Sequence, residues 1–113
     1  MNLYKSIFNR KDIISISKKW KIKELAVFGS VLRDDFTQDS DIDILIQFEP
    51  NTHYSLFDLV DLKDELEQAL GRSVDLVEKS SITNPFRKDE ILRTAKTIFP
   101  SRKLTKRYLG GKE

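Results

Sequence analysis

Residues 29–46, GSVLRDDFTQDSDIDILI, decide the fold of this chain. The stretch opens with a Gly29-Ser30 turn and ends in β-branched and aliphatic residues, which predict a strand over residues 41–48. Side chains alternate across a strand, so Asp41 and Asp43 are expected on one face and Ile42 on the other. Two neighbouring carboxylates repel unless a cation lies between them or one takes up a proton. Because carboxylate oxygens suit Mg²⁺, the pair predicts a divalent metal site.

The Gly29-Ser30 pair follows an apolar run, residues 24–28, which predicts a buried strand, and we expect a brief helix over residues 31–33. Backbone N–H groups and a hydroxyl at such a place could receive phosphate oxygens. Alone, a Gly-Ser pair is more often only a turn, and an Asp-x-Asp is more often the solvent face of an edge strand. The fixed order of Gly29-Ser30, Arg33, Ser40 and the two aspartates is what favours a binding site.

This order of residues resembles the DNA polymerase β-like nucleotidyltransferase superfamily, and specifically its minimal, antitoxin-type members, the MNT proteins of HEPN/MNT toxin–antitoxin pairs. The resemblance covers residues 25–77. It implies that Asp75, on a predicted strand over residues 73–77, joins Asp41 and Asp43 as catalytic metal ligands for two Mg²⁺ ions. From the residues alone, Asp75 would more often be a surface residue.

The same resemblance implies that Gly29 and Ser30 hold the phosphates of the substrate ATP, with Arg33 and Ser40 as further nucleotide-binding positions. Leu32 and Asp34 flank Arg33 where related sequences often have small residues. The role of Arg33 therefore stays open between a phosphate contact and a salt bridge to Asp35.

The function that the resemblance implies is that of an antitoxin enzyme, which transfers AMP from ATP to a hydroxyl, expected on tyrosine, of a cognate HEPN-type ribonuclease toxin. Two alternatives remain. The chain could neutralise its toxin by binding and occlusion without catalysis, or it could be an RNA-binding module that uses its basic end. The second has little support, because aromatic-rich binding motifs and a strongly basic face are lacking.

The order of predicted elements describes an α/β fold, a small mixed sheet covered by helices. We expect a first helix that runs toward Trp20 from a cap at Asn9 or Asp12. A second helix is expected from Ser55 to Gly71, a third from Asn84-Pro85, and a last strand over residues 97–99. In the second helix, the residues expected to pack on the sheet are Leu56, Leu59, Val60, Leu66 and Leu70.

Composition limits the remaining possibilities. The 113 residues fit one domain, which we expect over residues 1–99, followed by a basic, flexible tail over residues 100–113. The absence of cysteine excludes thiolate metal sites and cysteine nucleophiles, and the net charge of +2 makes nucleic acid an unlikely partner. No stretch has the length of a signal peptide or membrane span, so we expect a cytoplasmic protein without a membrane partner.

Overall fold

The computed structural model describes residues 7, 10–33, 36, 37 and 39–100, so the predicted basic tail lies outside the described residues apart from Pro100. Along the chain the elements are α2 (Lys11–Lys19), β1 (Ile22–Phe28), the 3-10 helix η1 (Gly29–Leu32), β2 (Ile42–Phe48), α3 (Leu56–Leu70), β3 (Val74–Glu78), the 3-10 helix η2 (Lys79–Ser81), α4 (Pro85–Thr94) and β4 (Lys96–Phe99). None of the described helices is long and apolar enough to cross a membrane.

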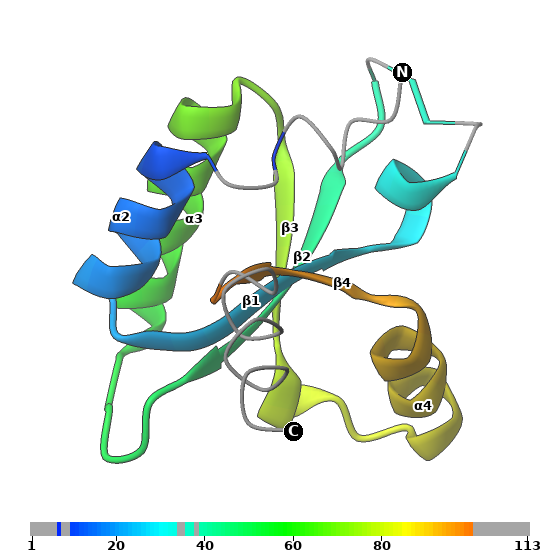
Figure 1. Cartoon of the computed structure of the whole chain (residues 1–113). Coiled ribbons are helices and arrows are strands. Elements are labelled where there is room, and N and C mark those ends of the chain that lie inside the picture. Colours follow the sequence, from blue (N-terminus) through cyan, green and yellow to red (C-terminus); the bar gives the residue numbers. More distant parts are fainter. Residues whose placement is uncertain (1–6, 8–9, 34–35, 38, 101–113) are drawn as a thin grey trace, which may run out of the picture.

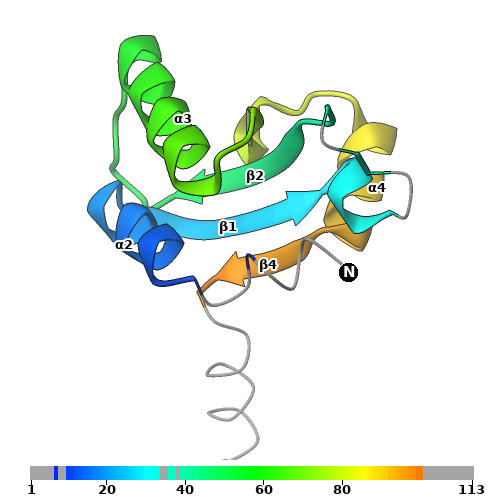
Figure 2. The same cartoon turned by 90° about the horizontal axis from the view of Figure 1, so that it is seen from above.

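The four strands form one mixed sheet in the order β3-β2-β1-β4. β1 pairs antiparallel with β2 and with β4, whereas β2 and β3 run parallel. α2 and α3 lie side by side against one face of this sheet, and α4 lies on the opposite side (Figures 1 and 2). The expected α/β fold with a mixed sheet under helices is confirmed.

Each face of the sheet has its own apolar core. On the side of α2 and α3, alternate strand residues such as Val27 and Ile44 join Ile13, Leu62 and Leu66 of the helices in one buried cluster. On the side of α4, a smaller cluster contains Ala26, Phe28, Leu45, Ile82 and Ile91. The alternation along β1 and β2 thus assigns neighbouring residues to opposite cores.

The ends of α3 follow the expectation from the sequence. The Ser55 hydroxyl accepts a hydrogen bond from the Asp58 N–H at 3.2 Å, and the Asp58 carboxylate accepts one from the Ser55 N–H at 2.9 Å. At the other end Gly71 adopts a left-handed conformation, with φ of 68°, and ends the helix. The α3 helix therefore has a full capping box and a glycine stop.

The prediction for the buried face of α3 is wrong in part. Leu66 is fully buried, but Leu56 and Val60 are 76% and 58% exposed, and the second fully buried residue is Leu62. At about 100° per residue, Val60 lies on the side of the helix opposite to Leu62. The packing of Leu62 and Leu66 on the sheet thus turns Val60 to solvent.

The prediction that Asp12 could cap the first helix is also wrong. The α2 helix begins after Arg10 without a side-chain cap, and Asp12 lies inside its first turn. The Asp12 carboxylate is occupied by the Arg10 guanidinium at 2.6 Å and by the N–H of Ile13, so it does not act as the cap. Asn9, the other candidate, lies outside the described residues. As expected, Ile13, Ile16 and Trp20 share the face that packs on the core.

Strand limits differ by one or two residues from the predicted ones. β1 begins at Ile22 rather than at residue 24, and β2 begins at Ile42, which leaves Asp41 just before the strand. The brief helix spans Gly29–Leu32 instead of residues 31–33. The last strand, Lys96–Phe99, and α4 with Asn84 as N-cap agree with the expectation.

Two leucines of α3 test the assignment of its buried face. Leu62→Ala should destabilise the protein by about 2–5 kcal/mol, because Leu62 is fully buried and its loss leaves a cavity. Leu56→Ala, on the same helix, should change the free energy of unfolding by less than about 0.5 kcal/mol. Urea unfolding measures both; equal losses would mean that α3 packs with a different face.

Candidate active site

Asp43 and Asp75 meet at the start of the parallel strand pair. They are register partners on β2 and β3, whose backbones in such a pair lie about 4.8 Å apart. Alternation places Asp43 on the same face as Leu45, and Asp75 on the same face as Val77. Leu45 and Val77 both belong to the core beneath α4, so the two carboxylates share the face of the sheet on which α4 packs.

Gly29 lies directly against Asp43. It follows the end of β1, where Phe28 is the register partner of Asp43, and it adopts a positive φ of 75°. A Cβ added at Gly29 would overlap the Oδ2 atom of Asp43 and would stand 3.2 Å from its Cγ. Only glycine therefore permits both the turn and the close approach of this carboxylate. Gly29 and Ser30 also open η1, where the first N–H groups of a helix have no acceptor within it.

Asp43 is an electrostatically strained carboxylate. Burial, and then the neighbouring charges of Asp75 and Asp41, raise the pKa of Asp43 above its ordinary value of 3.8. The folded chain thus holds the Asp43 proton more tightly than the unfolded chain does. The resulting contribution to stability is complete below pH 3.8 and is lost as the pH rises through the raised value. At neutral pH the ionised Asp43 works against folding.

Two arginines oppose this strain. The positive charges of Arg33 and Arg87 both act to lower the pKa of Asp43, although less than burial and the aspartates raise it. Arg33 follows η1, and Arg87 lies in the first turn of α4, below the Asn84 cap that accepts its N–H at 3.1 Å. Arg87 was not among the predicted site residues. Its spacing of four residues from the buried Ile91, on a predicted helix, was the signal that could have found it.

The remaining predicted residues lie around this centre. Asp41 is exposed and precedes β2, yet its charge acts on Asp43. The Ser40 hydroxyl accepts the N–H of Thr37 at 3.1 Å, and the Ser40 carbonyl accepts a hydrogen bond from Arg72 at 3.3 Å. These bonds hold the turn before β2, and the role of Ser40 in nucleotide binding stays a prediction. Asp35, the possible partner of Arg33, lies outside the described residues.

Residues 11–98 match the family described as nucleotidyltransferase domain. The chain belongs to this family. It is 42% identical over 82 residues to MJ1379 of Methanocaldococcus jannaschii, which is named as an inferred protein adenylyltransferase; the match covers 73% of this chain and 82% of that one. It is also 42% identical over 67 residues to the protein adenylyltransferase MntA of Thermococcus cleftensis, across 59% of this chain and 66% of that one.

Several solved structures have a similar fold. A structure described as a minimal nucleotidyltransferase superposes with a TM-score of 0.68 at 33% identity, covering 85% of this chain and 95% of that one. A toxin–antitoxin complex with AMP-PNP has a TM-score of 0.66 at 23% identity, over 81% of this chain and 73% of that chain. A complex of a tri-AMPylated HEPN toxin with an MNT antitoxin from Shewanella oneidensis has a TM-score of 0.57 at 22% identity, over 83% and 71%. At these lower identities the likeness concerns the fold.

The nucleotidyltransferase has a donor set that fits a divalent cation. Asp43 and Asp75 offer adjacent carboxylates, which are hard oxygen ligands, and burial together with the charges of Asp75 and Asp41 raises the pKa of Asp43. Within the described part of the chain, no three acidic or histidine side chains form a ready-made metal cluster. The carboxylates of Asp43 and Asp75 fit the ion by their chemistry. A ligand set of three aspartates that includes Asp41 stays a prediction.

Gly29 and Gly71 both have a positive φ, and substitutions at the two positions test whether Gly29 is needed for catalysis or only for the turn. Gly29→Ala should reduce nucleotidyl transfer by about a hundredfold, because the new methyl group displaces the Asp43 carboxylate. Gly71→Ala also has to adopt a positive φ, but nothing lies within 4 Å of its added Cβ. It should lose about 1 kcal/mol of stability and keep its activity.

Activity assays and urea unfolding of both variants provide this comparison. Wild-type turnover in Gly29→Ala would show that Gly29 serves only the turn.

Proposed function

We propose that this chain is an antitoxin enzyme that transfers AMP from ATP to a hydroxyl, expected on tyrosine, of a HEPN-type toxin. The observation that best supports this proposal is the close approach of Gly29 to Asp43, which places the Gly29-Ser30 turn beside the carboxylate pair. The relatives named as protein adenylyltransferases support the reaction, and the complexes of the same fold with a HEPN toxin and with AMP-PNP support the partner and the donor. A cytoplasmic location, where ATP is available, belongs to this proposal.

Each residue of the site has a part in this reaction. Asp41, Asp43 and Asp75 would hold Mg²⁺, which when bound supplies charge neutralisation and activation of the attacking oxygen. The N–H groups of Gly29 and Ser30 would bond the β- and γ-phosphates, and Ser40 would add a polar contact. The charges of Arg33 and Arg87 would offset the negative charge that develops on the leaving pyrophosphate. No covalent enzyme intermediate is required.

The site is open enough to accept a macromolecule. Asp75 is exposed, and it lies on β3, which forms one edge of the sheet. An acceptor side chain presented by another protein can therefore reach the carboxylates from the edge of the sheet. Such a substrate also brings its own contact surface.

Intact mass spectrometry of the toxin tests the proposed reaction. With ATP and Mg²⁺, the wild-type protein should add about 329 Da to the toxin for each AMP transferred, the mass of adenylate less water. Asp41→Asn/Asp43→Asn should abolish this mass increase, because it removes charges that bind the metal. Asp61→Asn/Asp64→Asn, which removes two exposed carboxylates of α3, is the control and should leave the transfer unchanged.

An assay of how well the protein protects cells from the toxin distinguishes enzymatic neutralisation from neutralisation by binding alone. If Asp41→Asn/Asp43→Asn neutralises the toxin as well as the wild type does, and the toxin keeps its unmodified mass, the chain acts by binding alone and the enzymatic proposal is wrong.

A further inference from the structure

Asp41 is held in place through the two peptide groups that flank it. On its amino side, the Ser40 carbonyl accepts a hydrogen bond from the Arg72 guanidinium at 3.3 Å. On its carboxyl side, the Ile42 N–H donates to the Ser73 carbonyl at 2.9 Å. Arg72 and Ser73 are consecutive residues in the connection from α3 to β3. The backbone of the exposed Asp41 is therefore fixed by one short segment from a distant part of the chain.

Arg72 makes further contacts with the residues before Asp41. Its guanidinium also donates to the Thr37 carbonyl, which accepts the N–H of Ser40 at 3.1 Å as well. The Cζ atom of Arg72 lies over the Phe36 ring, 4.5 Å from the ring centre. A planar guanidinium can bond two carbonyls in fixed directions and stack on an aromatic ring at the same time, whereas the ammonium group of a lysine cannot. Arg72 thus holds the whole turn that leads into Asp41.

Arg72 also lies close to Asp75 along the chain. Asp75 follows it by three residues, at the start of β3. The register of the parallel strands pairs Val74, just before Asp75, with Ile42, just after Asp41. The two segments that carry Asp41 and Asp75 therefore meet where Arg72 bridges them.

A second arginine makes a comparable link elsewhere in the fold. The Arg10 guanidinium donates to the Ala69 carbonyl at 2.9 Å and bonds the Asp12 carboxylate, so it joins the start of α2 to the end of α3. Both arginines connect segments that are far apart in the sequence, but only Arg72 contacts the segment that leads into Asp41. The Nε atom of Arg72 is moreover buried without a hydrogen-bond partner among the described residues, which costs free energy. Stability alone does not explain the position of Arg72.

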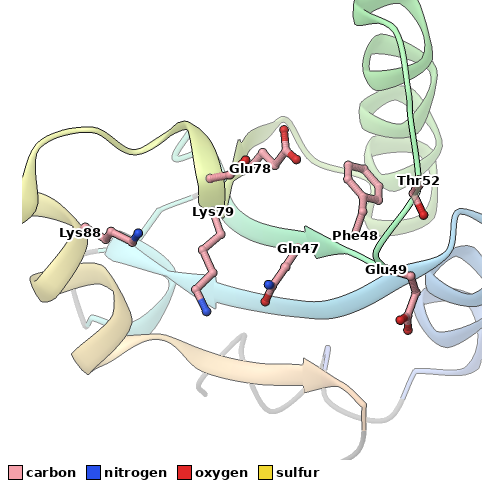
Figure 3. A pocket seen from close by; sticks show the side chains of 8 residues that line it. Gln47, Phe48, Glu49, Thr52, Glu78, Lys79 and Lys88 are labelled. Carbon is pink, nitrogen blue, oxygen red and sulfur yellow. The ribbon is translucent and has the colours of Figure 1, made fainter.

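The far end of β2 and β3 is built differently. A cavity of about 360 Å³ lies there beside η2 and α4, and Lys79 and Lys88 are among the residues that line it (Figure 3). Gln47, which also lines it, is four residues after Asp43 on β2, so the cavity is roughly 13 Å from the carboxylates. At such a distance exposed charges are largely screened. The cavity therefore has no direct part in holding Asp41.

We propose that Arg72 is a positioning residue for the metal site, which holds Asp41 where its carboxylate can join those of Asp43 and Asp75 around a divalent cation. The inference rests on the proposed function and deepens it, because it names the residue on which the third ligand depends. The described acidic side chains do not form a ready-made cluster of three. With its backbone fixed, Asp41 needs only rotation about its side-chain bonds to reach the cation.

Charge and position act in opposite directions at Arg72. Its positive charge by itself disfavours a nearby cation, so loss of the charge alone would strengthen metal binding. Loss of the fixed backbone at Asp41 weakens metal binding, because the ligand then has to be ordered when the ion binds. The direction of the change in metal affinity therefore shows which effect dominates.

Binding of Mn²⁺ alone tests the inference without any transfer reaction. Mn²⁺ accepts the same oxygen ligands as Mg²⁺, and electron paramagnetic resonance measures its free concentration. Arg72→Ala should weaken Mn²⁺ binding by about tenfold to a hundredfold, as is usual when a residue that orients a metal ligand is lost. Arg72→Lys keeps the charge and one donor and should lose less. In an Asp41→Asn background Arg72→Ala should cause no further loss, because Arg72 acts through Asp41.

Two further variants serve as controls. Arg10→Ala should lower the midpoint of urea unfolding, as Arg72→Ala does, but should keep the wild-type Mn²⁺ affinity. Lys79→Ala removes a positive charge at the cavity end of the strands and should change the Mn²⁺ affinity by less than about twofold.

The possible results separate this inference from the proposed function. Unchanged or stronger Mn²⁺ binding in Arg72→Ala, or the same loss with and without Asp41→Asn, would overturn the role of Arg72 and leave the proposed function intact. An equal loss of Mn²⁺ affinity in Arg10→Ala would also overturn it, because stability alone would then explain the effect. A wild type that binds no Mn²⁺ would overturn the metal site, and with it both the proposed function and this inference.

Discussion

Asp43 and Asp75 occupy paired positions on parallel strands, and their negative charges repel each other across one strand spacing. This arrangement has to be enforced by the rest of the fold. A parallel pair needs a crossover, which α3 provides, and the burial of Leu62 and Leu66 on the opposite face of the sheet offsets the repulsion. A slip of β3 by one residue would turn Asp75 to the other face, so the apolar pattern of the strand also fixes the site.

Strong local signals made much of this fold predictable. The Ser55 capping box and the Gly71 stop define the two ends of α3. Both depend on short-range hydrogen bonds and backbone preferences of a few adjacent residues, so they can be predicted from the sequence. The same is true of the Asn84-Pro85 start of α4. The expectation that Asp43 lies close to a glycine turn needed more than local chemistry, since it came from a family resemblance, and the overlap of a Gly29 Cβ with Asp43 gives it a physical basis.

Features that depend on distant contacts could not be predicted in the same way. Nothing in the apolar spacing of α3 distinguishes Val60 from Leu62, and only the docking of the helix on the sheet decides which one is exposed. Arg87 acts on Asp43 because α4 packs on the sheet through Ile91, and the four-residue spacing of Arg87 and Ile91 does not by itself say which face of the sheet α4 covers. Phe57 and Phe86, at 83% and 86% exposed, are likewise large apolar residues whose exposure is decided by how their helices pack on the sheet.

Strain at Asp43, relieved by a bound cation, is the central claim of this account, and a carboxyl-detected NMR titration of Asp43 tests it most directly. In metal-free buffer the pKa of Asp43 should lie above 3.8, because burial and Asp75 disfavour the charged form. Addition of Mg²⁺ should lower that pKa, whereas the carboxyl signal of Asp61 on α3 should not respond. A titration of Asp43 at its ordinary pKa that Mg²⁺ leaves unchanged would contradict the account.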